Sequence, residues 1–172
     1  MADPKRLVLL KAICAHLEAT VQRSRGYNFD LDGRVFRGRT VFGDDEPLPA
    51  VSILDSPQPD RETTPDKAAG SVQVEDYPLL VQGWAPEDRV NPTDPAHLLI
   101  ADVKKALALL MDPRAPATHR MPVPGAPGGL MIASRISGGV VRPPDTVSCR
   151  AYFFLPYTVT FKESLADPFK LN

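Results

Sequence analysis

Cysteine and tryptophan are scarce in this chain. Of its 172 residues only Cys14 and Cys149 are cysteines, and Trp84 is the single tryptophan. Small secreted domains usually carry several cysteines as a disulfide framework. We therefore expect both cysteines to be reduced core residues, because each lies in an apolar periodic segment. A Cys14–Cys149 disulfide is the alternative, since the sequence does not give the distance between the two sulfur atoms.

Charge of one sign and long hydrophobic runs are also lacking. Lys and Arg total 20 against 21 Asp and Glu, which gives a net charge of −1. A protein that binds nucleic acid normally concentrates excess positive charge. The apolar runs are far shorter than the roughly 20 residues needed to cross a bilayer, and the N-terminus has no signal-peptide pattern. We expect a cytoplasmic protein that binds neither nucleic acid nor membrane.

Motifs that organise chemistry are missing too. His16, His97 and His119 lie far apart and belong to no zinc-binding spacing. No phosphate-binding loop occurs, because the glycine-rich segment 125–129 lacks the lysine and the following helix, and no nucleophile elbow occurs. We therefore expect no catalytic residue, cofactor or metal. The first two histidines are expected to be surface or half-buried helix residues, and we find no partner for the third.

Proline, in contrast, is abundant. The 19 prolines are about twice the usual share, and they indicate long extended connections. The hydrophobic fraction of 43% is ordinary, and the length fits one domain over residues 1–172.

Two segments have the spacing of amphipathic helices. Asp3 and Pro4 form a cap-and-proline start, and Gly26 supplies the stop. Between them, apolar residues recur at helical spacing at Leu7, Leu10, Ile13, Cys14, Leu17 and Val21. A second cap-and-proline start at residues 93–95 opens an apolar stripe that ends at Pro113.

Five segments are expected to be strands: residues 34–42, 50–54, 77–85, 130–136 and 148–161. In the first, Phe36 and Phe42 share one face. We expect the first two strands and the last two strands to pair as hairpins, and Pro156 to mark a bend or an edge. The predicted fold class is α+β: a mainly antiparallel sheet of about five strands with two helices packed on it and long proline-rich loops.

Residues 57–76 are rich in Pro, Asp, Glu, Thr and Lys without apolar periodicity. We predict a mobile loop there, which becomes ordered if a partner binds it. A second irregular connection is expected over residues 113–129.

Asp44, Asp45 and Glu46 are the best candidates for carboxylate chemistry. Neighbouring carboxylates raise one another's pKa or hold a hard cation. Consecutive residues of a turn, however, point in different directions and stay solvated. A polar turn is therefore the simpler interpretation, with an interface contact and an enzyme of unrecognised type that uses Asp44 and Asp45 as alternatives.

Arginines and the tryptophan are the candidate interface residues. Arg34, Arg37, Arg39 and Arg150 lie on expected strands, where guanidinium groups pair with carboxylates across strands or between subunits, or stay solvated. Trp84 is either a core residue or an interface anchor. The candidate subunit or partner interface comprises Arg37, Arg39, Asp44, Asp45, Glu46, Trp84 and Arg150.

Several segments resemble small neck and tail proteins of tailed bacteriophages. They are Val-Phe-Arg-Gly-Arg at residues 35–39, the segment 42–54, Leu-Val-Gln-Gly-Trp at residues 80–84 and the helical pattern at 95–111. Their order is similar to that of tail terminator proteins over residues 1–112.

The resemblance implies a structural virion protein of the tail neck, assembled in the host cytoplasm. Such a subunit forms a ring, usually of six copies, on the head-proximal end of the tail tube, where it stops tube growth and receives the head connector. Its implied partners are further copies of itself, the tail tube protein and the head completion or connector protein. The alternative within this class is a head–tail connector or tail-completion protein.

Overall fold

The computed structural model describes residues 3–42, 46–56, 72–110 and 131–169. In chain order, its elements are the helix α1 (Lys5–Thr20), the short 3-10 helix η1 (Arg23–Arg25), β1 (Val35–Arg37), β2 (Ala50–Asp55), β3 (Val72–Trp84), α2 (Asp94–Leu109), β4 (Ala133–Ile136), β5 (Val140–Arg142) and β6 (Tyr152–Ser164). The strands form one six-stranded sheet in the order β1-β2-β3-β6-β4, with β5 also paired to β6. The predicted α+β class, with a mostly antiparallel sheet and two helices, is confirmed.

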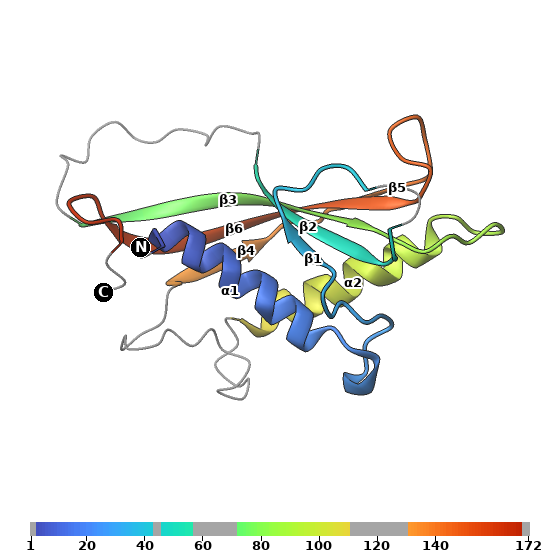
Figure 1. Cartoon of the computed structure of the whole chain (residues 1–172), viewed down its shortest axis with the longest axis horizontal. Helices are drawn as coiled ribbons and strands as arrows, with labels where there is room; N and C mark the ends of the chain where they lie inside the picture. Colours follow the sequence, from blue (N-terminus) through green and yellow to red (C-terminus); the bar gives the residue numbers. More distant parts are fainter. Residues whose placement is uncertain (1–2, 43–45, 57–71, 111–130, 170–172) are drawn as a thin grey trace.

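Both helices pack on the same face of the sheet (Figure 1). Side chains alternate along a strand, so every second residue points toward the helices. On β6 these are the buried Phe153, Leu155, Tyr157, Val159 and Phe161. They meet the apolar stripes of the helices and form the main hydrophobic core, to which α1 contributes Leu9, Ile13, Cys14 and Leu17 and α2 contributes Leu99, Val103, Ala106 and Leu107.

Both predicted helices are present, but their first turns differ from the expected capping. Neither Pro4 at the start of α1 nor Thr93 at the start of α2 caps its helix through a side chain. Asp3 instead forms an ion pair with Lys11 at 2.5 Å. In α1, Leu9 is fully buried whereas Leu7 and Leu10 are half-buried, so the buried stripe is rotated from the predicted one.

The expected hairpin between β1 and β2 is wrong, because the two strands are parallel, with Val35 opposite Val51. The strand predicted over residues 34–42 ends at Arg37, and Gly38 turns the chain with a φ of +68°. Parallel neighbours need a crossover of about a dozen residues. That crossover runs from Gly38 to Pro49, and its described residues, 38–42 and 46–49, form no helix.

The strands β3 and β6 are the longest in the sheet and pair along their whole length. Because β3 begins at Val72, residues 72–76 belong to the sheet, and the prediction of a mobile loop over 57–76 is wrong for them. The rest of that predicted loop, 57–71, lies outside the described residues.

Two prolines lie inside these strands where a neighbouring strand stops. The carbonyl of Pro78 accepts a hydrogen bond from the Ser56 amide just beyond β2, and that of Pro156 accepts one from Ser137, between β4 and β5 (both 3.0 Å). The backbone nitrogen and the carbonyl of a strand residue face the same neighbouring strand. The N–H that each proline lacks would therefore face a position where the neighbouring strand has already ended. Pro156 therefore fits within a central strand, which corrects the predicted bend or edge.

Gly138 and Gly139 separate β4 from β5, and Gly139 has a φ of +75°. The strand β4 pairs antiparallel with β6, as expected for the last two predicted strands, and β5, which was not predicted, also pairs antiparallel with β6. The connection predicted over 113–129 lies outside the described residues. None of the helices in the described part of the chain is long and apolar enough to cross a membrane.

Candidate interaction surface

The face of the sheet away from the helices carries the remaining aromatic residues. Alternation along the strands places Phe36, Trp84, Tyr152 and Phe154 on this helix-free face. The crossover from β1 to β2 and the connection into β6 lie on this side (Figure 1). The sheet is therefore covered by helices on one face and by loops on part of the other.

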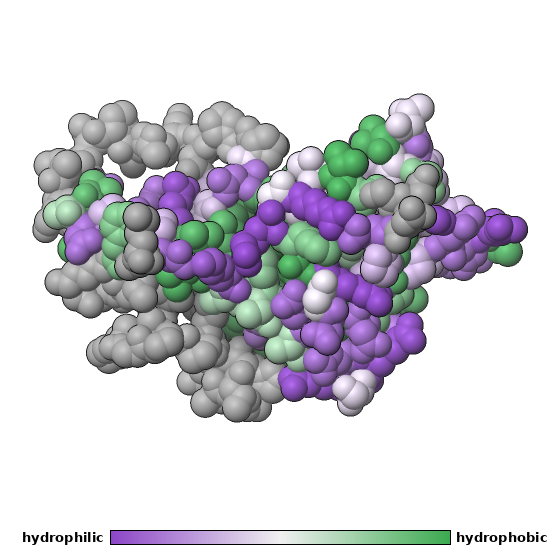
Figure 2. Space-filling view, in the orientation of Figure 1, coloured by the Kyte–Doolittle hydropathy of each residue, from purple (hydrophilic) through white to green (hydrophobic). Residues whose placement is uncertain are grey.

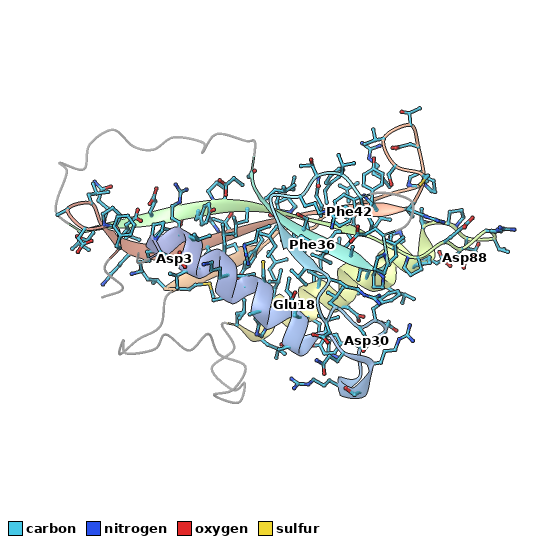
Figure 3. The ribbon with its side chains drawn as sticks, in the orientation of Figure 1. Asp3, Glu18, Asp30, Phe36, Phe42 and Asp88 are labelled. Carbon is cyan, nitrogen blue, oxygen red and sulfur yellow. The ribbon has the colours of Figure 1, made fainter. Side chains whose placement is uncertain are left out.

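Phe36, Phe42 and Trp84 form an aromatic cluster above β2 and β3. The ring centroids of Phe36 and Phe42 are 5.4 Å apart in an edge-on arrangement, and those of Phe42 and Trp84 are 4.2 Å apart. Figure 3 shows Phe36 and Phe42 lying together beside β2. Trp84 is only 8% exposed, yet it does not belong to the main core.

Arg39 fastens the crossover onto this cluster. Its guanidinium carbon lies 4.7 Å from the centre of the Phe36 ring and 4.5 Å from that of Phe42. Two of its nitrogens pair with the two carboxylate oxygens of Glu46, at 3.0 and 2.5 Å. Its backbone N–H donates to Ser52 Oγ at 3.1 Å, which anchors the crossover to β2. This forked pairing combined with ring stacking is specific to arginine.

We expect Arg39→Ala to loosen the crossover while leaving the fold intact. The free energy of unfolding should fall by about 1–2 kcal/mol, because the pair is half-exposed and the lost ring contacts add to it. Trp84 should become more accessible, measured as a higher rate of fluorescence quenching by acrylamide. The matched control is Arg37→Ala, an exposed arginine two residues away on the opposite face of the sheet. Equal quenching in the two variants would contradict the assigned role of Arg39.

A recess of about 320 Å³ opens next to the aromatic cluster. Its walls come from the crossover, the centre of the sheet and the connection into β6. The lining residues include Phe42, Gln82, Trp84, Val147, Tyr152 and Phe154. Val41 and Val147, on the two sides of the recess, are 76% and 82% exposed. Figure 2 shows hydrophobic surface at the top right of the view, beside the connection that leads into β6. The recess is thus a partly open apolar site.

Asp145 organises the connection that forms one wall of the recess. Its Oδ1 accepts the backbone N–H groups of Val147 (2.8 Å) and Ser148 (3.1 Å), and its Oδ2 accepts the Tyr152 hydroxyl at 2.7 Å. The hydrogen bond from Tyr152, followed by those from the backbone, holds the pKa of the Asp145 carboxyl below its ordinary value. The same bond raises the pKa of Tyr152. At neutral pH the carboxylate is therefore ionised and the wall is fixed.

Most polar groups around the recess are paired within the chain. Arg150 Nη1 binds Glu87 Oε2 at 2.8 Å, and the Ser148 hydroxyl donates to the Arg150 carbonyl at 2.9 Å. The side-chain amide of Gln82, in contrast, lines the recess without a hydrogen bond to any residue that the structure describes. The recess therefore offers aromatic walls, neutral polar side chains such as that of Gln82, and no carboxylate among its described lining residues.

Four of the seven predicted interface residues converge here. Trp84 and Arg150 line the recess, and Arg39 pairs with Glu46 beside it. Arg37 lies on the opposite face beside Cys14 of α1, so it does not belong to this surface. Asp44 and Asp45 lie outside the described residues. Val147, Tyr152 and Phe154 also line the recess but were not among the predicted interface residues. Tyr152 and Phe154 alternate with the buried Phe153, so strand alternation could have identified the two aromatic residues.

The two cysteines differ, which corrects the expectation that both are core residues. Cys14 is buried under the sheet, whereas Cys149 is exposed at the recess, and neither forms a disulfide. Burial raises the pKa of the Cys14 thiol to about 11.

We expect a colorimetric thiol reagent at pH 8 to modify Cys149 rapidly and Cys14 only after unfolding. With a pKa about three units above the pH, only about one Cys14 thiol in a thousand is ionised, and the thiolate is the reactive form. The measurement is the number of thiols that react before and after addition of denaturant. Cys149→Ser should abolish the fast phase, and two fast thiols in the wild type would refute the assignment.

Metal-binding geometry is absent from the described residues, which hold no group of three His, Cys, Asp or Glu side chains suited to a metal. His16 is half-buried and its Nε2 lies 2.8 Å from the Ala106 carbonyl, which links α1 to α2. His97 is exposed on α2, so both histidines match the prediction. His119 lies outside the described residues.

Neither a protein-family model nor any curated protein sequence matches this chain.

Proposed function

We propose that this chain is a tail terminator of a tailed bacteriophage, a structural protein that acts by assembly and not by turnover. In this role, copies of the chain form a ring on the head-proximal end of the tail tube. The ring ends polymerisation of the tube protein and presents a surface for the head connector. Its partners are its own copies, the tube protein and the connector.

The apolar recess on the helix-free face carries the proposal. Interface hot spots are enriched in tryptophan, tyrosine and arginine, at sites where aromatic residues are surrounded by polar groups. Here Trp84, Phe42 and Phe154 form the walls, and the ion pairs Arg39–Glu46 and Arg150–Glu87 lie at the border. The polar groups bind one another, which suits a complementary protein surface better than a reacting substrate.

The positions of other exposed apolar residues also support assembly into a closed ring. Val72 and Val74 are exposed on the part of β3 that pairs only with β6, far along that strand from Trp84 and the recess. Two unlike surfaces on one subunit allow head-to-tail contacts, which close into a ring when the rotation between neighbours completes a circle.

Light scattering at several protein concentrations, together with negative-stain imaging, tests the proposal. We expect a species of about six subunits that appears as annuli and that caps purified tail tubes when the tube protein is supplied. A monomer at every concentration that also fails to bind tube ends would exclude this function. An open, unlimited filament would also exclude it, because a terminator must form a closed assembly.

A further inference from the structure

A short loop between β3 and α2 presents the most exposed large hydrophobic residue in the described part of the chain. Val90 is 84% exposed, and its neighbours are the charged Arg89 and the polar Asn91. Figure 3 shows Asp88 on this loop, at the far end of the molecule from the start of α1 in Figure 1. Figure 2 shows a small hydrophobic spot there within a hydrophilic surrounding.

The tip of this loop is held in a fixed shape. Asp88 Oδ1 accepts the backbone N–H of Val90 at 2.8 Å and that of Asn91 at 2.9 Å. These bonds keep the pKa of the Asp88 carboxyl below its ordinary value, so the turn is present at neutral pH. Glu87 also ties the base of the loop to Arg150. A fixed tip loses little conformational entropy when it binds, which favours a binding role for its apolar side chain.

The recess and the tip are complementary in size and chemistry. A cavity of about 320 Å³ has room for a valine side chain and part of its backbone, and its walls are aromatic. The Gln82 amide supplies a donor and an acceptor for a backbone peptide group of the entering loop. Arg142, opposite Tyr152 at the border of the recess, has the sign that attracts the ionised Asp88.

We propose that the recess of one copy receives the Val90 tip of another copy. The tip does not fill its own recess, because Val90 is exposed while its loop is tied to the border through Glu87 and Arg150. The two surfaces are different, so the contact is heterologous and each subunit has one of each. The inference rests on the proposed function, in that it names the contact that joins neighbours in the ring.

Two exposed valines allow each side of the contact to be changed without disturbing the core. Val90→Asp places a carboxylate on the tip, and Val147→Asp places one at the wall of the recess. Each should raise the dissociation constant for self-association at least about tenfold, because a charge would be buried against aromatic rings. The matched control, Leu165→Asp, alters an exposed leucine just beyond the end of β6 and should leave this contact unchanged.

Mixing the two variants is the decisive experiment. Val90→Asp keeps an intact recess and Val147→Asp keeps an intact tip, so the mixture has one working contact per pair. We expect each variant alone to be monomeric by native mass spectrometry and the mixture to give a one-to-one complex that does not grow further. Trp84, the only tryptophan, should show a blue-shifted emission in the mixture but not in either variant alone.

The outcomes separate this inference from the proposed function. If Val90→Asp forms normal rings, the proposed contact is overturned but the tail-terminator proposal still stands. A mixture that stays monomeric, or a wild type that stays monomeric at every concentration with an unchanged Trp84 emission, would also overturn it. If the mixture pairs while the wild type forms dimers without annuli, the contact stands and the tail-terminator proposal fails.

Discussion

Gly83→Ala is expected to reduce the free energy of unfolding by about 3 kcal/mol, because the centre of the sheet has no room for a side chain there. Gly83 lies directly opposite Phe153 in the β3–β6 pair. A Cβ atom on Gly83 would fall within 3.0 Å of three carbon atoms of the Phe153 ring. This ring is fully buried beneath the helices, so it has no free space into which to move.

A double-mutant cycle measured by urea unfolding tests this explanation. Phe153→Leu removes the ring that causes the clash and should cost about 1–2 kcal/mol alone. If the ring is the cause, Gly83→Ala should cost at least about 1 kcal/mol less in the Phe153→Leu background than in the wild type. Gly138→Ala is the control, because a Cβ at Gly138 meets nothing within 4 Å. Additive costs, or an equal cost at Gly138, would contradict the prediction.

The same glycine shows what sequence reasoning can and cannot supply. The sequence predicted a strand over residues 77–85, and the structure confirms this strand as part of β3, which ends at Trp84. The close approach of Phe153 to Gly83 depends on the register between two strands that are distant in sequence. Register follows from the packing of the complete sheet, so local pattern alone does not reveal which glycine must remain a glycine.

The parallel pairing of β1 and β2 was not predictable for a related reason. Residues 34–42 alternate in polarity, and an acidic, proline-containing turn follows them, which together are typical of a hairpin. In the structure Gly38 ends β1, and Arg39 directs the crossover onto the helix-free face through Glu46 and Ser52. Tertiary contacts of one arginine therefore override the local turn signal.

Trp84 illustrates how far the candidate site was predictable. The sequence left open whether this residue is a core residue or an interface anchor. Its ring is nearly buried, but against Phe42 on the helix-free face rather than in the main core. A residue buried by a loop instead of a helix combines a fixed position with proximity to the surface. This arrangement depends on the path of the crossover, which local sequence patterns do not predict.

Asp102→Ala is expected to reduce the free energy of unfolding by about 3–4 kcal/mol, which is a large part of the stability of a typical domain. Asp102 lies on α2 and is 4% exposed. Its carboxylate accepts the backbone N–H groups of Asn28 (2.8 Å) and Phe29 (3.2 Å) and the side-chain amide of Asn28 (2.9 Å). Removing it leaves the buried Phe29 N–H and the partly buried donors of Asn28 without this partner, in the segment that joins α1 to β1.

Asp102→Asn should cost at most about half as much, because its carbonyl oxygen can take the place of Oδ2 and accept both backbone N–H groups, and the Asn28 amide can rotate to accept from the new NH2 group. The measurements are urea unfolding and hydrogen exchange at the amides of Asn28 and Phe29, where protection should fall first. Asp94→Ala, an exposed carboxylate in the first turn of the same helix, should cost less than about 1 kcal/mol. If Asp94 and Asp102 cost the same, the carboxylate at 102 does not hold this segment, and the packing of Phe29 and Leu31 in the core must position it instead.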